Sequence, residues 1–178
     1  MIPPVETITS FLQQIGLPHE FQRIEQDTFL PGLLIRNGVL IIDHDKLLYP
    51  GDILHEAGHL AVMPEAIRKN MNADLGNNQI HQGGELMTLA WSYAACIHLR
   101  LDPHIVFHPH GYKGQAEQLV DAFSNGNYLG LPLLQWQEMA FDGHTAQQLG
   151  VQPYPHMVNW ICPVNRYELS STETASHA

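Results

Sequence analysis

The sequence is poor in cysteine, in basic residues and in long apolar stretches. Two cysteines, Cys96 and Cys162, occur in 178 residues. A secreted disulfide scaffold usually contains more, so we expect two buried free thiols, with a single bridge as the alternative. No segment contains the roughly 20 apolar residues of a membrane span, and the first residues show no basic and apolar leader pattern. We therefore expect a cytoplasmic protein that does not associate with membranes.

Basic residues are outnumbered by acidic ones, which restricts the possible partners. The chain has 8 Lys and Arg against 18 Asp and Glu, a formal net charge of −10. Nucleic acids and anionic membranes attract clustered Lys and Arg, so we expect neither as a partner. The chain is long enough for a real core, and we expect one domain over 1–169 followed by a polar tail over 170–178. The sequence leaves the oligomeric state open.

Residues 55–59 read His-Glu-Ala-Gly-His, an HExxH pattern. Residues four apart on a helix lie on one face, so His55 and His59 can bind the same metal ion. Glu56 can then reach a water on that metal without coordinating it. Two imidazoles suit zinc, which binds nitrogen, sulfur or carboxylate ligands in a tetrahedral arrangement.

The residues around the motif favour a short helix. The run 48–62 is mostly apolar, Pro50 fits a first-turn position, and Asp52 favours the positive end of the helix dipole. Pro64 ends the helix. We expect a metal site inside a largely buried helix; the alternative is a polar face exposed to water that binds no metal.

A catalytic zinc site needs a third protein ligand and leaves one position for water. Glu85 begins a second predicted helix, over 85–100, whose nearly continuous apolar residues predict burial beside the first helix. We therefore predict Glu85 as the third ligand. Glu65, His81 and Asp74 are the alternatives.

The rest of the chain predicts a small sheet and additional helices. Asn37-Gly38 separates two apolar runs, 33–36 and 39–43, as in a hairpin whose tight turn needs positive φ at both central residues. Further helices are expected over 5–15, 115–123, 131–141 and 145–149. The expected fold class is α+β, with a small antiparallel sheet packed on two core helices that carry the metal ligands.

His55-Glu56-x-x-His59 followed by Glu85 resembles the zincin metallopeptidases, in particular the glutamate-ligand branch called gluzincins. The preceding hairpin is similar to the small zincin core, in which a sheet edge lies above the metal. The resemblance covers about residues 30–100. It implies a zincin-like fold, one Zn²⁺ per chain and hydrolysis of a peptide bond.

His108, His110 and Tyr112 cluster in a loop rich in His and Gly. In gluzincin-like enzymes a His or Tyr donates a hydrogen bond to the oxyanion that forms on the scissile carbonyl. The resemblance therefore implies a catalytic role for one of the three, and we assign it to His110 or Tyr112. The alternative is an exposed loop without a role in catalysis.

These observations predict a zinc-dependent hydrolase, specifically a metallopeptidase with a peptide or protein substrate. Glu56 is expected to act as the general base that takes a proton from water and passes it to the leaving amine. An exposed hairpin strand is expected to hold an extended peptide. The alternative is a non-catalytic zincin-like module that uses its metal for regulation or interaction, although an intact Glu56 argues against it.

Overall fold

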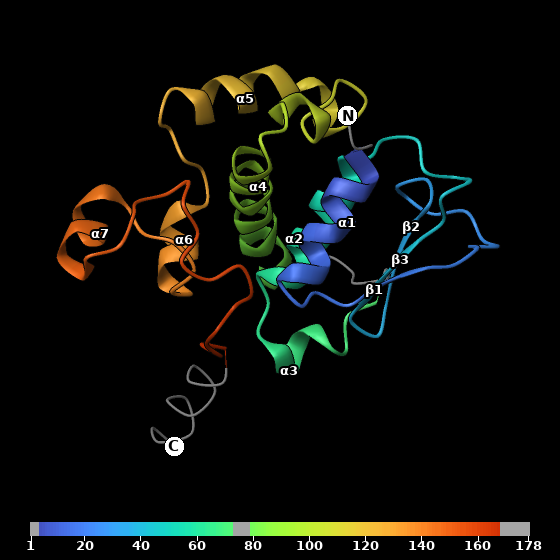
Figure 1. The fold of residues 1–178 in the computed structure, drawn as a ribbon, viewed down its shortest axis with the longest axis horizontal. Coiled ribbons are helices and arrows are strands. Elements are labelled where there is room, and N and C mark those ends of the chain that lie inside the picture. Colours follow the sequence, from blue (N-terminus) through green and yellow to red (C-terminus); the bar gives the residue numbers. More distant parts are fainter. Residues whose placement is uncertain (1–3, 73–78, 168–178) are drawn as a thin grey trace.

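Helices and one small sheet make up the α+β fold of this chain (Figure 1). The computed structural model describes residues 4–72 and 79–167. In the helix that begins at Gln79, side chains are described from Gly83 onward. In chain order the elements are α1 (Pro4–Gln14), β1 (His19–Phe21), β2 (Leu33–Arg36), β3 (Val39–Ile42), α2 (Asp52–Ala61), α3 (Glu65–Arg68), α4 (Gln79–Leu99), η1 (Pro103–Ile105), η2 (Tyr112–Gly114), α5 (Ala116–Ser124), α6 (Leu131–Trp136) and α7 (Gly143–Leu149).

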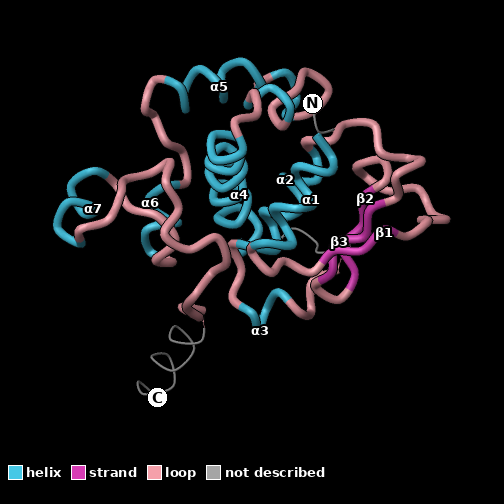
Figure 2. Tube along the Cα trace, viewed as in Figure 1, coloured by secondary structure: helices cyan, strands magenta, loops and turns pink. Residues whose placement is uncertain are grey.

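The strands gather at one side of the molecule in the order β1-β3-β2 (Figure 2). The predicted hairpin is confirmed: β2 and β3 are antiparallel, and the turn residues Asn37 and Gly38 have φ of 49° and 75°. The expectation of a purely antiparallel sheet is wrong, because β1 pairs with β3 in parallel. β1 is three residues long and mostly exposed, so it lacks the apolar alternation that identifies a strand in sequence.

The main hydrophobic core lies between α1, α2, α4 and the sheet. It is one cluster of buried side chains that extends along the chain from Ile8 to Cys162. Ile8 and Leu12 of α1 are buried there, as the helical spacing predicts. In Figure 1, α5 crosses one end of α4, and α6 and α7 lie on the side away from the sheet.

Three predicted helix boundaries are wrong. α4 begins at Gln79, so Glu85 lies in its second turn, whereas we expected Glu85 to begin the helix. Gly83 and Gly84 therefore lie inside α4, although glycine costs about 1 kcal/mol in a helix. A Cβ at Gly84 would lie 2.9 Å from Cε at the flexible end of the Met63 side chain, which can move aside, so packing does not require this glycine.

The other two errors have local causes. α2 begins at Asp52, so Pro50 precedes the helix and does not occupy its first turn. α6 ends at Trp136, short of residue 141, and Glu138 just beyond it has φ of 59°, which a right-handed helix does not allow.

Cys96 and Cys162 are both free and buried, as expected. Burial raises the pKa of the Cys96 thiol to about 12, so it is an unreactive thiol at neutral pH. Across 4–72 and 79–167, every helix is too short or too polar to cross a membrane. The predicted tail over 170–178 lies outside the described residues.

Candidate metal centre

α2 directs the two histidines of the HExxH pattern toward α4. Its buried stripe faces the core and consists of Ile53, Leu54, Ala57, Leu60 and Ala61. His55 and His59 lie on another face, one above the other, because they are four residues apart. Their ring planes are perpendicular, with centroids 4.7 Å apart.

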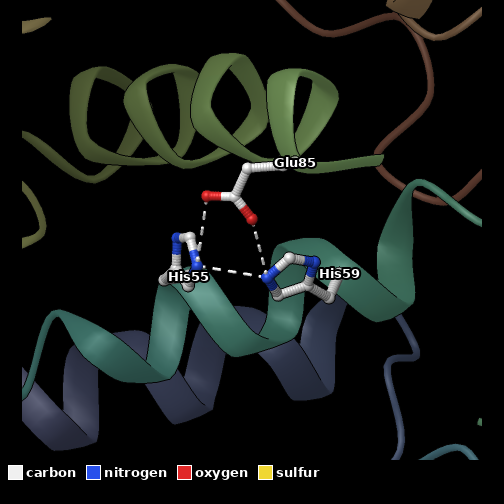
Figure 3. Close-up of side chains that lie close together, drawn as sticks. All are labelled: His55, His59 and Glu85. Carbon is white, nitrogen blue, oxygen red and sulfur yellow. Dashed lines mark hydrogen bonds and ion pairs between the residues drawn. The ribbon is translucent and has the colours of Figure 1, made fainter. Parts of the chain in front are cut away.

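The three residues predicted as ligands are brought together at the contact of α2 with α4 (Figure 3). The two Nε2 atoms of His55 and His59 are 3.1 Å apart. The Oε1 atom of Glu85 lies 3.7 Å from Nε2 of His55, and its Oε2 atom lies 3.3 Å from Nε2 of His59. Within the described part of the chain, this is the one group of three or more His, Cys, Asp or Glu whose ligand atoms could share a metal ion.

These distances fit a zinc ion. Zinc–nitrogen bonds of about 2.0–2.1 Å in a tetrahedral site separate two ligand atoms by about 3.3–3.4 Å. The separation of the two Nε2 atoms, 3.1 Å, and that of Oε2 of Glu85 from Nε2 of His59, 3.3 Å, are close to that value, and the other carboxylate oxygen, Oε1, lies 3.7 Å from Nε2 of His55. Glu85 keeps 44% of its side-chain surface exposed and His59 27%, so the cluster is open to solvent on their side. Catalytic zinc sites have three protein ligands and an open position, whereas structural sites are closed by four.

Each imidazole contacts a hydroxyl through the nitrogen that faces away from Glu85. The Tyr112 hydroxyl lies 3.0 Å from Nδ1 of His55, and the Thr88 hydroxyl lies 3.3 Å from Nδ1 of His59. If Nδ1–H donates to the hydroxyl oxygen, Nε2 keeps the lone pair that binds a metal. Sequence reasoning missed Thr88, although it follows Glu85 by three residues and therefore shares its face of α4.

Burial sets the protonation of the cluster. It lowers the pKa of His55 to about 3, with further contributions from His59 and His108, so the ring is neutral at pH 7 as a metal ligand must be. Burial also raises the pKa of Glu85. Burial first, and then the nearby carboxylates of Asp52 and Glu85, raises the pKa of Glu56 to about 7, in the range that suits a general base.

A cavity of about 440 Å³ adjoins the centre, and both Glu56 and His59 line it. The other lining residues come from the loop before β2, from β2 itself and from the segment after α3: Gln26, Asp27, Thr28, Phe29, Leu30, Leu33, Leu34, Ile35, Arg36, Met71 and Asn72. All four residues of β2 border the cavity. Because neighbouring side chains of a strand point to opposite faces, this means that the backbone edge of β2 faces the cavity.

Gly58, inside the motif, permits the close approach of the two helices. A Cβ atom there would lie 2.9 Å from Cγ2 of Thr88 and 3.3 Å from Cε3 of Trp91. A side chain at position 58 would therefore press on Thr88 and Trp91 of α4, the helix that brings Glu85 and Thr88 to the histidines.

The remaining candidates lie in different places. Tyr112 contacts the centre through His55, whereas His110 is exposed and stacks on Tyr49 with ring centroids 5.6 Å apart. The oxyanion role of either residue stays a prediction. His108 is buried, and its Nε2 atom lies 2.8 Å from Oδ1 of Asp52.

Of the alternative third ligands, Glu65 is exposed on α3 and does not belong to the cluster. Asp74 and the side chain of His81 lie outside the described part of the structure.

Comparison of this chain with protein-family models, with curated proteins and with solved structures gives no match in any of the three.

Proposed function

We propose that this protein is a zinc-dependent hydrolase, specifically a zincin-like metallopeptidase. His55, His59 and Glu85 hold one zinc ion, and Glu56 is the general base. The observation that carries the proposal is the convergence of two imidazole nitrogens and a carboxylate beside a cavity that Glu56 also lines. A site that only holds metal has no need of a base in that position.

Zinc in such a site supplies Lewis acidity, which polarises a carbonyl and lets water ionise near neutral pH. Glu56 accepts the proton from that water on its carboxylate and returns it to the leaving amine. Burial first, and then the nearby carboxylates of Asp52 and Glu85, raises the pKa of Glu56 and strengthens its hold on the proton. His59 and Glu56 line the same cavity, so a ligand and the base face a common space.

Within the described residues β2 pairs on one edge only, with β3, and this supports a peptide substrate. The side chains of β2 are mostly buried, in contrast to the exposed strand expected from sequence, so a peptide would pair with its backbone edge. In β3 the N–H of Leu40 donates to Pro18 O and the C=O of Ile42 accepts from Gln22 N–H, so the backbone groups of both residues face β1. Leu40 lies opposite Ile35 of β2, and Ile42 lies opposite Leu33. The N–H and C=O groups of Ile35 and Leu33 therefore point away from β3. The N–H of Leu33 donates to Leu30 O at 3.1 Å, which leaves Ile35 as the position where an extended peptide can add to the sheet beside Glu56.

A peptide library digested by the zinc-loaded protein and analysed by mass spectrometry tests this function. We expect cleavage that a zinc chelator stops and added zinc restores. Glu56→Gln should retain zinc and lose about 10²–10⁴-fold in rate, because only the base is removed. A zinc-loaded wild type that cleaves no peptide would favour the non-catalytic metal-binding module, and undiminished cleavage by Glu56→Gln would refute the assigned mechanism.

A further inference from the structure

The segment 105–112, here called the clamp segment, lies alongside the first turn of α2, the helix that carries His55 and His59. Gly51, at the N-cap of α2, allows its closest approach, since a Cβ there would lie 1.9 Å from the carbonyl oxygen of Ile105. His108 contacts Asp52 at 2.8 Å, and Tyr112 contacts His55 at 3.0 Å. The clamp segment and the start of α2 therefore run in the same direction, since contacts later in the clamp segment are made to residues later in α2.

The contact of His108 with Asp52 is buried, and Tyr49 covers one face of the His108 ring. The Asp52 carboxylate accepts a hydrogen bond from Nε2–H of His108, and the two residues are 4% and 8% exposed. Tyr49 stacks on the His108 ring with centroids 4.1 Å apart and an angle of 18°. Charged or polar groups this deeply buried are costly to separate, so this contact fixes the clamp segment on the head of α2.

Tyr112 reaches His55 from an unusual backbone conformation. Its φ is 56° and that of Lys113 is 51°, a left-handed conformation that residues other than glycine rarely adopt. Its ring packs between Phe107, at a centroid distance of 5.3 Å, and the edge of His55, at 5.6 Å. Such conformations persist only where surrounding contacts hold them, and they gather at functional sites.

The Tyr112 hydroxyl determines which nitrogen of His55 is available. In the tautomer that binds a metal, Nδ1–H donates to the hydroxyl oxygen, and the lone pair of Nε2 is then directed at Glu85 and His59. A group that fixes the tautomer and orientation of a ligating imidazole is normally worth 10–100-fold in metal affinity.

We propose that the clamp segment is a built-in support for the metal centre, in which Tyr112 is a positioning residue for His55 and the His108–Asp52 contact holds Tyr112 in place. This inference rests on the zinc site proposed above. It separates Tyr112 from the oxyanion role expected from sequence, because a positioning hydroxyl affects metal binding whether or not substrate is present.

Zinc titration of the full chain against a chromophoric chelator tests the proposal. Tyr112→Phe, which removes only the hydroxyl, should weaken zinc binding by about 10–100-fold. The matched control is Tyr154→Phe. It removes a buried hydroxyl that donates to the Ala90 carbonyl at 2.8 Å on α4 and contacts no ligand, and it should leave zinc affinity unchanged. Thermal unfolding of the metal-free variants shows whether each is folded.

Two further readouts separate positioning from general stability. The visible spectrum of the Co²⁺-substituted protein should change in Tyr112→Phe and not in Tyr154→Phe, because only the first alters a ligand. His108→Phe keeps the stack on Tyr49, should weaken zinc binding less than Tyr112→Phe, and should add little to it in the double variant because both act through His55.

The outcomes are distinguishable. Wild-type zinc affinity and Co²⁺ spectrum in Tyr112→Phe would overturn the proposal, and a fall in turnover alone would then assign the hydroxyl to the substrate. A folded wild type that binds no zinc would overturn the zinc site itself, and this inference with it.

Discussion

The two histidines of the centre are supported in different ways. On the His59 side, support comes from packed helices: Gly58 lets α4 approach, and Thr88 contacts the ring from the helix that also carries Glu85. On the His55 side, support comes from Tyr112, 57 residues away along the chain. One half of the site is therefore part of a helix pair, whereas the other half depends on a loop held in place by its own contacts.

The largest expected effect concerns the residue that joins the two halves. Glu85→Ala should weaken zinc binding by orders of magnitude, since it leaves two imidazoles on an under-coordinated ion. Glu65→Ala is the matched control, because Glu65 is an exposed carboxylate on α3 outside the cluster. Competition titrations on both variants measure this. Retained affinity in Glu85→Ala with loss in Glu65→Ala would show that the third ligand is misassigned.

Gly58→Ala tests the helix-packed half. The new Cβ would meet Cγ2 of Thr88 at 2.9 Å, so we expect a loss of about 1–3 kcal/mol in the free energy of unfolding of the metal-free protein. Thr88→Ser in the same chain removes Cγ2, keeps the hydroxyl, and should recover much of the loss. Denaturant titrations compare these variants with Gly143→Ala, where no atom lies within 4 Å. Equal stability of Gly58→Ala and Gly143→Ala would refute the close approach.

Thr88→Val compares the two supporting hydroxyls directly. It preserves the shape of a fully buried side chain and removes the contact with His59, so zinc affinity should fall about tenfold. The fall should be smaller than that of Tyr112→Phe, because the Thr88 contact is longer, at 3.3 Å against 3.0 Å. Ser92→Ala is the control, since Ser92 lies on the same helix and its hydroxyl donates to the Leu54 carbonyl instead of contacting a histidine. A larger effect of Thr88→Val would reverse the comparison.

Asp43 follows β3 and does not belong to the metal centre, and here we expect the smallest effect. Its carboxylate accepts hydrogen bonds from the N–H groups of Ile24 and Asp45, and the Ile24 bond chiefly lowers its pKa from 3.8. A lowered pKa stabilises the folded state above pH 3.8, and this contribution is lost as pH falls through the folded-state pKa. Asp43→Asn should lower Tm by a few degrees at pH 7.

The pH dependence of that difference is the diagnostic result. The Tm gap between wild type and Asp43→Asn should shrink as the pH is lowered through the folded-state pKa, because the wild-type carboxylate becomes protonated. Asp45→Asn, at an exposed neighbouring position, should show no such gap. A gap independent of pH would mean that the charge of Asp43 does not contribute.

The same contrast explains what the sequence could predict. The four-residue spacing of His55 and His59 is local, so it predicted their common face on a helix, and the Asn-Gly turn predicted the hairpin. Glu85 could be proposed only by its place near a second apolar helix. The predicted start of that helix was wrong because the helix includes Gly83 and Gly84, which helix propensity disfavours.

Other features depend on contacts between distant parts of the chain. β1 becomes a strand only through its pairing with β3. Tyr112 was noticed in sequence as a candidate for catalysis, but its contact with His55 follows from the left-handed turn that ends the clamp segment and from the burial of His108. The pairing of β1 with β3 and the contact of Tyr112 with His55 both join residues that are distant in the sequence. Local spacing patterns therefore cannot predict them.

The most direct test of the account is the metal content of the purified protein, measured by elemental mass spectrometry after incubation with zinc and removal of unbound ions. We predict one zinc ion per wild-type chain and none in a folded His55→Ala, His59→Ala double variant. A folded wild type that retains no first-row metal and takes up no zinc would contradict the account at its centre.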